Sequence, residues 1–276
     1  MGYKKQINKI TKSIKEGVAP VGIFVFTRDV SVIEVIGDSG FDFIIIDAEH
    51  TRLNGETLEH QIMAAQLHDV TPIVRVPDNI PYMIRHAMEA GALGVAVPHI
   101  TSREDCRRAQ EALRFAPYGK AGMCPTIRAT SYNVNYWDEH VETVNEISLI
   151  AMIEDPIAMN DLDGILDELK PGRDLVLFGK ADFSQGLAKK EQGMLVDLNN
   201  PETTVAFKKV VEECIKRKIS VMASPYPGLG SEDIRNIVTD GGQAIILDTD
   251  LMLLHNSFRK ILGRAKGINL NSKSLV

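Results

Sequence analysis

The sequence predicts one α/β domain with the (β/α)8 barrel architecture, over residues 1–266. Apolar runs and helical patterns alternate along the chain, which is typical of a parallel sheet. Eight such units within about 250 residues are the number that a closed barrel needs. The alternative is a doubly wound sheet, but no G-x-G-x-x-G motif follows the first apolar run, and eight units are more than that fold requires.

The apolar runs predict eight strands. The clearest is the second, where three consecutive isoleucines follow Gly40 with no polar break, as expected for a strand covered on both faces. The expected strands are Val21–Thr27, Phe41–Asp47, Thr71–Val76, Gly94–His99, Ser148–Glu154, Leu175–Gly179, Ser220–Ser224 and Gln243–Asp248.

Amphipathic patterns between these runs predict the helices. Ile7, Ile10 and Ile14 have helical spacing before Gly17, and we expect this short first helix to close the bottom of the barrel. The other expected helices are Ser31–Ser39, Glu56–His68, Tyr82–Ala90, Arg103–Arg114, Ala158–Leu169, Glu202–Arg217, Ser231–Asp240 and Leu251–Ala265.

Three segments depart from a plain barrel. Residues 115–145 are rich in Pro, Gly, Tyr and Asn and contain the only tryptophan, and we expect a loop of this length to be a lid or a subunit contact. Residues 184–200, after the sixth strand, form a second candidate lid. The polar tail, residues 267–276, has no periodicity and is expected to fray.

Composition narrows the class of protein. A net charge of −6 argues against a nucleic-acid or anionic membrane partner. Cys106, Cys124 and Cys214 are far apart and form no CxxC pair, which suits free thiols in a reducing cytoplasm. The first residues contain no apolar signal-peptide core, and no apolar run approaches the roughly 20 residues of a membrane span.

Charged side chains stand at the carboxyl ends of several expected strands. In parallel α/β folds these ends meet on the face where ligands bind, so the side chains should converge on one pocket. Burying them without partners would cost several kcal/mol each, so something must neutralise the carboxylates. The residues at these ends are Asp47, Glu49, His50, Arg75, Glu154, Asp182 and Asp248.

Glu154 and Asp182 follow adjacent strands and form the candidate metal site. Two carboxylates with room for water and substrate oxygens suit a hard octahedral cation such as Mg²⁺ or Mn²⁺. The alternative is that one of them pairs with Lys180 or Arg75. The backbone amides around Ala181 and Asp182 follow a glycine at a turn and could bind a carboxylate.

Arg75 and His50 are the candidate catalytic residues. Arg75 is always charged and suits a carbonyl oxygen that becomes an enolate, although it could instead form a structural ion pair with Asp47 or Glu49. His50, oriented by Asp47, is the candidate base and would act through a water molecule; the alternative is that both cap the next helix. His99 fits core packing and pocket lining equally well.

Five motifs, in this order along the chain, carry a resemblance. They are Gly40-Phe41-Asp42 with Asp47-Ala48-Glu49-His50, Pro72-Ile73-Val74-Arg75-Val76, Ala90-Gly91-Ala92 with Val97-Pro98, Ile153-Glu154, and Gly179-Lys180-Ala181-Asp182-Phe183-Ser184. Together they resemble the metal-dependent (class II) pyruvate aldolases of the HpcH/HpaI type, within the phosphoenolpyruvate/pyruvate barrel superfamily. The resemblance extends from about Gly22 to Gly263.

The resemblance implies a site and an assembly. Glu154 and Asp182 would hold Mg²⁺, Mn²⁺ or Co²⁺, a 2-oxo acid would chelate that ion, and Arg75 would contact its keto oxygen. His50 and Asp47 would handle protons. Glu89 matches an acidic position that can reach a neighbouring subunit's site. The family barrel exchanges its last helix between neighbours, often in hexamers built from dimers.

Three positions depart from the family pattern. Met152 stands where a glutamine is usual, Lys180 stands in a Gly-Pro-x-Asp motif in place of proline, and Ala121 replaces the arginine of a Pro-x-Gly-x-Arg-Gly loop. Lys180 would place a positive charge beside the metal and substrate. The enolate-forming residues therefore match the family, whereas the residues on the side of the second substrate differ.

The main functional hypothesis is a carbon–carbon lyase that cleaves a 4-hydroxy-2-oxo acid reversibly into pyruvate and an aldehyde. One alternative uses oxaloacetate on the same enolate-forming site, either in a Claisen-type condensation with an acyl-CoA, like a citrate synthase, or in a decarboxylation. Another is a non-catalytic barrel that only binds a 2-oxo acid. The sequence leaves the second substrate, the metal, the pathway and the direction of the reaction open.

Overall fold

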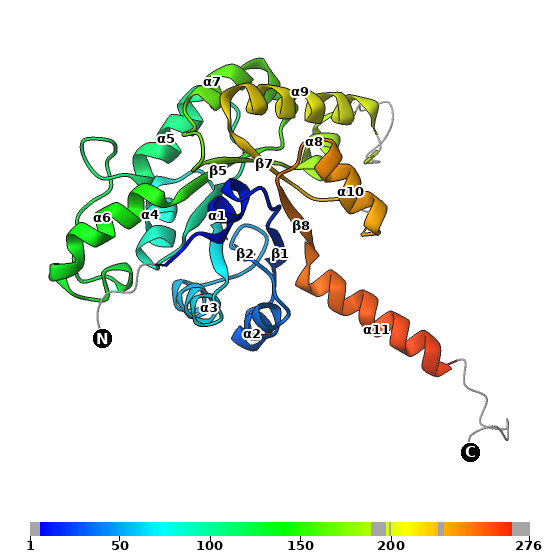
Figure 1. Ribbon diagram of the computed structural model, residues 1–276, viewed down its shortest axis with the longest axis horizontal. Coiled ribbons are helices and arrows are strands. Elements are labelled where there is room, and N and C mark those ends of the chain that lie inside the picture. Colours follow the sequence, from blue (N-terminus) through cyan, green and yellow to red (C-terminus); the bar gives the residue numbers. More distant parts are fainter. Residues whose placement is uncertain (1–5, 189–196, 199, 226–228, 267–276) are drawn as a thin grey trace.

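Eight parallel strands close into a barrel in the order of the sequence, with β8 hydrogen-bonded to β1 (Figure 1). The computed structural model describes residues 6–188, 197–198, 200–225 and 229–266. This architecture confirms the predicted (β/α)8 fold, and each expected strand is present. The strands are β1 (Val21–Val25), β2 (Phe43–Asp47), β3 (Thr71–Arg75), β4 (Gly94–Val97), β5 (Ser148–Ile153), β6 (Leu175–Phe178), β7 (Ser220–Ala223) and β8 (Ala244–Thr249).

The buried run of β2 serves two cores at once. Phe43 and Ile45 belong to the cluster inside the barrel, whereas Ile44 and Ile46 belong to the layer between strands and helices. All four side chains are fully buried, and each contributes about 1.5–3 kcal/mol by the removal of apolar surface from water. A continuous apolar run is therefore what this position requires.

The first helix closes the amino-terminal end of the barrel, as predicted. Ile10 joins the interior cluster, and the Asn8 side chain donates to the carbonyl oxygen of Leu93 at 3.1 Å. None of the described helices combines the length and apolar composition needed to cross a bilayer. The described helices are α1 (Lys9–Lys15), α2 (Val30–Asp38), α3 (Gly55–Leu67), α4 (Pro81–Glu89), α5 (Arg103–Leu113), α6 (Trp137–Glu146), α7 (Leu162–Asp167), α8 (Lys180–Gly186), α9 (Pro201–Arg217), α10 (Ser231–Thr239) and α11 (Asp250–Lys266).

Residues 115–145 are not a lid over this chain's own ligand-binding face. They contain two short 3₁₀ helices, η1 (Arg128–Thr130) and η2 (Val134–Tyr136), and α6. Arg128 donates to the carbonyl oxygen of Ala90 at 2.8 Å and to the Gln66 side chain at 2.6 Å. Both acceptors precede strands, so this segment packs at the amino-terminal end of the barrel. Its use as a subunit contact stays a prediction.

The expected helix Ala158–Leu169 is interrupted. The structure has a 3₁₀ helix, η3 (Pro156–Asn160), followed by α7. Asp161 separates them with a non-helical backbone (φ −129°, ψ 30°), and its carboxylate accepts a hydrogen bond from the Arg103 backbone amide at 2.7 Å. Helix α8 falls where no helix was expected. Most of the second candidate lid (residues 189–196 and 199) and the tail (residues 267–276) lie outside the described residues.

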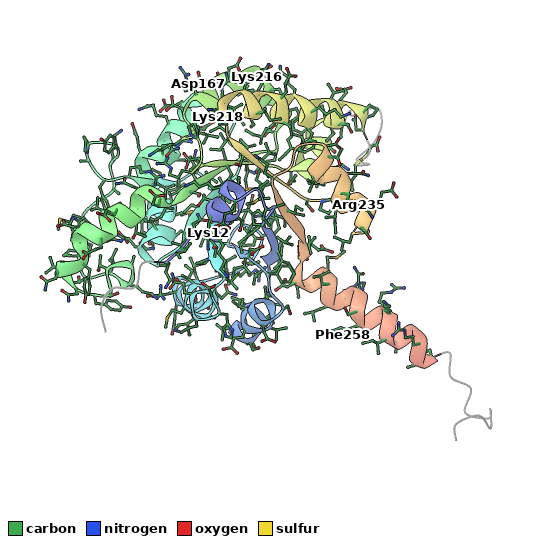
Figure 2. All side chains as sticks on the ribbon, viewed as in Figure 1. Lys12, Asp167, Lys216, Lys218, Arg235 and Phe258 are labelled. Atoms are coloured by element: carbon green, nitrogen blue, oxygen red, sulfur yellow. The ribbon has the colours of Figure 1, made fainter. Side chains whose placement is uncertain are left out.

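Helix α11 projects away from the barrel (Figure 1). The Asp250 carboxylate fixes its first residue by accepting hydrogen bonds from the backbone amides of Phe26 and Thr27, at 2.9 and 3.0 Å. Beyond Asp250, no side chain of this helix is buried. Phe258 is 64% exposed and lies on this projecting helix, outside the barrel (Figure 2). Within the described ranges, the last helix therefore leaves an apolar face without a partner in its own chain.

Candidate active site

A cavity of about 330 Å³ opens at the carboxyl ends of the strands. Its charged lining comes from β3, the end of β5, α8 and β8. The fold thus brings together residues that are more than one hundred positions apart in the sequence. The polar and charged residues in the lining are Arg75, Glu154, Lys180, Asp182, Ser224, Asp248 and Thr249.

Glu154 is buried with few hydrogen-bond partners. Its Oε1 accepts a hydrogen bond from the His99 backbone amide at 2.9 Å. Burial, together with the negative charges of Glu49 and Asp182, raises the pKa of this carboxyl to about 7, and the hydrogen bond from His99 opposes the shift. A side chain at Gly179 would place its Cβ only 2.9 Å from Oε2, so glycine is needed for this carboxylate to fit. Asp182 is exposed in the first turn of α8.

Arg75 is held rigidly in the wall of the cavity. Its Nε lies 2.8 Å from an Asp47 oxygen, its Nη1 lies 3.1 Å from Glu49 Oε2, and its guanidinium stands 4.8 Å from the centre of the Phe24 ring. The ion pair that the sequence left open as an alternative is present. Two carboxylates fix the guanidinium, which remains in the cavity lining beside Glu154.

The structure does not place the His50 imidazole on Asp47. The Asp47 carboxylate accepts hydrogen bonds from Arg75 and from the backbone amides of Glu49 and His50. The imidazole instead lies 3.7 Å from Glu49 Oε2 and is half exposed. Asp47 therefore holds Arg75 and the turn after β2, and Glu49 is the carboxylate that faces His50.

Glu49 and His99 complete the cluster. The sequence placed Glu49 among the converging strand-end residues without giving it a role, and it left His99 open between core packing and pocket lining. Glu49 meets Arg75 and His50, and its Oε1 lies 3.7 Å from His99 Nε2. Burial raises the pKa of Glu49, while the charge of Arg75 opposes that shift. His99 is not a core residue, because 56% of its side chain is exposed at the rim of the site. The Asp-x-Glu-His spacing after β2 was the available signal for Glu49.

Of the two remaining predicted site residues, Lys180 lies in the cavity and Glu89 lies outside it. Lys180 lines the main cavity and a neighbouring cavity of about 200 Å³, and no ion pair with Glu154 or Asp182 is found in the described part of the chain. Glu89 ends α4 and lies 3.6 Å from Arg85. That end of α4 is at the amino-terminal face, so Glu89 is remote from its own chain's cavity.

The donor set fits a hard divalent cation. The described residues contain no cluster of three or more His, Cys, Asp or Glu side chains that would enclose a metal. A structural zinc site needs four such ligands, whereas Mg²⁺ uses one or two carboxylates and completes its shell with water and substrate oxygens. Glu154 and Asp182 supply that pair of carboxylates, and their mutual repulsion favours a cation between them.

Comparison with known proteins gives a consistent result. The family model described as HpcH/HpaI aldolase/citrate lyase matches residues 21–257. A 2-dehydro-3,6-dideoxy-6-sulfogluconate aldolase of Pseudomonas putida is 31% identical over 172 residues, which is 62% of this chain and 66% of that protein. A 2-keto-3-deoxy-L-rhamnonate aldolase of Salmonella gallinarum is 23% identical over 95% of this chain and 94% of its own length.

A solved structure is also similar. The crystal structure of the citrate synthase SbnG superposes with a TM-score of 0.81 at 30% sequence identity, and the match covers 94% of this chain and 98% of that one. The family match extends from the first strand of the barrel into the last helix, and it includes every residue of the candidate site. This chain belongs to the HpcH/HpaI aldolase/citrate lyase family.

Proposed function

We propose that this chain is a divalent-metal-dependent aldolase that cleaves a 4-hydroxy-2-oxo acid into pyruvate and an aldehyde and catalyses the reverse condensation. The class of enzyme, a carbon–carbon lyase of the aldolase type, is confirmed by the family and by the relatives. The observation that carries the proposal is the buried Glu154 carboxylate, which lines one cavity with Asp182 and the fixed guanidinium of Arg75.

Glu154 and Asp182 would hold Mg²⁺, Mn²⁺ or Co²⁺, which when bound would draw electron density from the keto oxygen of the 2-oxo acid. The backbone amides of Ala181 and Asp182 lie in the first turn of α8, where amides have no helical acceptor, and they would bind the substrate carboxylate. Lys180, beside them, would add a positive charge on the side of the second substrate.

The chain's own side chains would carry out the proton transfers and stabilise the enolate. His50, whose imidazole lies 3.7 Å from Glu49, takes the proton of the 4-hydroxyl group as the C3–C4 bond breaks. The aldehyde leaves, and the bonding electrons pass to C3 and the keto oxygen to form the enolate of pyruvate. Arg75 donates to that oxygen as its charge grows. The proton taken up by His50 is then returned to C3, directly or through water, which gives the methyl group of pyruvate and restores the base.

We also propose that the chain forms a homo-oligomer in which α11 packs on a neighbour. Apolar side chains recur on this helix at intervals of three, four, three and one residues, and all of them are exposed, which is unusual for a helix without a partner. They are Leu251, Leu254, Phe258, Ile261 and Leu262. Glu89, remote from its own cavity, would then be available to a neighbour's site.

A second function is supported by one specific likeness. The citrate synthase SbnG is 30% identical over nearly the whole chain, and Met152 and Lys180 line the cavity where the family pattern has other residues. A Claisen-type condensation of oxaloacetate with an acyl-CoA, or a decarboxylation of oxaloacetate, would use the same enolate.

Proton exchange into pyruvate tests the common step. The purified protein is stripped with a chelator, resupplied with Mg²⁺ or Mn²⁺, and incubated with pyruvate in D₂O while the methyl protons are followed by NMR. Exchange that requires the metal supports the aldolase, and aldehydes added next identify the second substrate. Binding of pyruvate without exchange would leave only a binding protein. Citrate formed from oxaloacetate and acetyl-CoA would favour the second function, and borohydride trapping of a lysine adduct would replace the metal mechanism.

A further inference from the structure

His99 has a backbone conformation that is unusual at this place in the fold. Its φ is +53°, in the left-handed region. Asp69 and Lys218 share this conformation, but each follows the end of a helix, where it is common. His99 instead follows strand β4 at the ligand-binding face. For a non-glycine residue this conformation is strained, so the surrounding structure must stabilise it.

The compensating contact is made by the backbone rather than the side chain. The His99 N–H donates to Glu154 Oε1 at 2.9 Å, and hydrogen bonds to carboxylates are among the stronger ones in proteins. The imidazole contacts are longer, at 3.7 Å to Glu49 and 3.8 Å to Glu154. Most of the imidazole remains exposed.

We propose that His99 is a positioning residue for Glu154, acting through its backbone amide, and that it determines which carboxylate oxygen receives the divalent cation. The inference rests on the metal-dependent function proposed above. Because the amide occupies Oε1, the other oxygen is left for the cation. That oxygen, Oε2, lies against Gly179, where the chain turns towards Asp182.

A backbone role predicts an unusual order of substitutions at position 99. Glycine adopts positive φ without strain and asparagine tolerates it, so both should preserve the hydrogen bond. Valine is β-branched and strongly disfavours positive φ, so it should move the amide away from Glu154. A role for the imidazole predicts a different order, in which glycine is as damaging as valine.

The test is the affinity for Mn²⁺, measured by electron paramagnetic resonance and calorimetry on the intact protein without substrate. We expect His99→Gly and His99→Asn to bind Mn²⁺ within about threefold of the unsubstituted protein, and His99→Val to bind at least tenfold more weakly. Lys218→Gly and Lys218→Val are matched controls, because they alter a left-handed residue far from the site. They should change the melting temperature and leave Mn²⁺ affinity unchanged.

The amide itself offers a readout that needs no metal. In a two-dimensional ¹⁵N spectrum, the residue 99 amide signal should shift strongly in Glu154→Gln and remain close to its native position in Asp182→Asn. Equal loss of Mn²⁺ affinity in the glycine and valine variants would overturn the backbone role. Unchanged affinity in all three variants would overturn any positioning role. Absence of Mn²⁺ binding in the unsubstituted protein would instead overturn the metal-dependent function, and this inference with it.

Discussion

Two buried carboxylates at opposite ends of the barrel differ in how their own chain satisfies them. Asp174 precedes β6 at the amino-terminal end, and its side chain is fully buried. Glu154 follows β5 at the carboxyl-terminal end and accepts one hydrogen bond, from His99, among the described residues. The donors to Asp174 are the Gln110 side-chain amide, the backbone amides of Leu149 and Lys170, and the Arg173 guanidinium.

The difference separates a structural acid from a candidate functional one. The oxygens of Asp174 are filled by donors that tie β5, β6 and α5 together, so nothing remains for a ligand. The carboxyl of Glu154 is left with a raised pKa and further negative charge nearby. Buried charges are expected to be paired, and an incomplete set of partners within the chain points to a partner from outside it.

The largest expected effect is on turnover. Glu154→Gln should lower kcat for metal-dependent exchange of pyruvate protons by about a thousandfold, because removing a group that stabilises transition-state charge costs that much or more. NMR exchange rates at saturating Mn²⁺ measure it. Asp174→Asn, where it folds, should keep kcat within about threefold. Near-normal exchange in Glu154→Gln would contradict the assignment of this carboxylate to the metal.

Asp174→Asn should act on stability instead. It should lower the free energy of unfolding by about 3 kcal/mol, because removing one partner of a buried ion pair leaves Arg173 and Arg114 without their counter-charge. Urea denaturation followed by circular dichroism measures it. A loss below about 1 kcal/mol would contradict the conclusion that Asp174 stabilises the fold.

The raised pKa of Glu154 gives the site a defined pH dependence. Protons compete with the cation below pH 7, so the apparent Kd for Mn²⁺ should rise about tenfold per pH unit between pH 7 and 5.5 and should be flat above pH 7.5. Calorimetry at a series of pH values measures it. A flat profile down to pH 5.5 would mean that the carboxyl is ionised well below neutrality.

The raised pKa of Glu154 also affects the stability of the fold. Stability should fall as pH rises, whereas a salt-bridged acid with a lowered pKa makes stability rise with pH. Between about pH 4.5 and 7 the folded protein without metal holds a proton that the unfolded chain has lost, so stability falls as pH rises through this window. Glu154→Gln should remove this dependence, and its stability should equal or exceed that of the unsubstituted protein at pH 8.

The smallest expected effect concerns His140, a buried polar side chain that lacks hydrogen-bond partners in the described part of the chain although it lies far from the candidate site. It is buried at the amino-terminal end beside Trp137, and neither ring nitrogen has a hydrogen-bond partner among the described residues. Burial lowers its pKa to about 4. The unfolded chain therefore binds the proton first, and the stability present above pH 6.5 is lost as pH falls towards 4.

His140→Leu should remove that loss. Relative to the unsubstituted protein, its free energy of unfolding should improve by about 1 kcal/mol between pH 6.5 and 5.5, since one pKa unit corresponds to 1.36 kcal/mol. Denaturant titrations at the two pH values measure it. The variant should leave Mn²⁺ affinity unchanged. A change in affinity would show that His140, at the amino-terminal end of the barrel, contributes to the site at the carboxyl-terminal end.

The sequence predicted the strands well, because their signal is local. A buried parallel strand must be apolar on both faces, and β2 shows that requirement directly in Phe43 to Ile46. Interruptions such as the one at Asp161 were missed, because they depend on a hydrogen bond to Arg103, which is distant in the sequence. The position of residues 115–145 was missed for the same reason, since Arg128 fixes it through contacts with α3 and the end of α4.

At the site, the sequence identified which charged residues meet but not how they pair. Strand ends converge by topology, so Arg75, Glu154 and Asp182 could be grouped from their positions alone. The choice between Asp47 and Glu49 as the partner of His50 depends on where the turn after β2 directs each side chain. The left-handed backbone of His99 has no signal in a single sequence, because the contact that its amide makes is with Glu154, which is distant along the chain.

The projecting α11 bears on the order of events during synthesis. Every strand from Val21 to Thr249 precedes this helix in the sequence, so each strand is synthesised before it. The strands can therefore begin to pair before Phe258 and its exposed apolar neighbours have left the ribosome. Under the homo-oligomer proposed above, this order shortens the time during which that apolar face is open to misassembly.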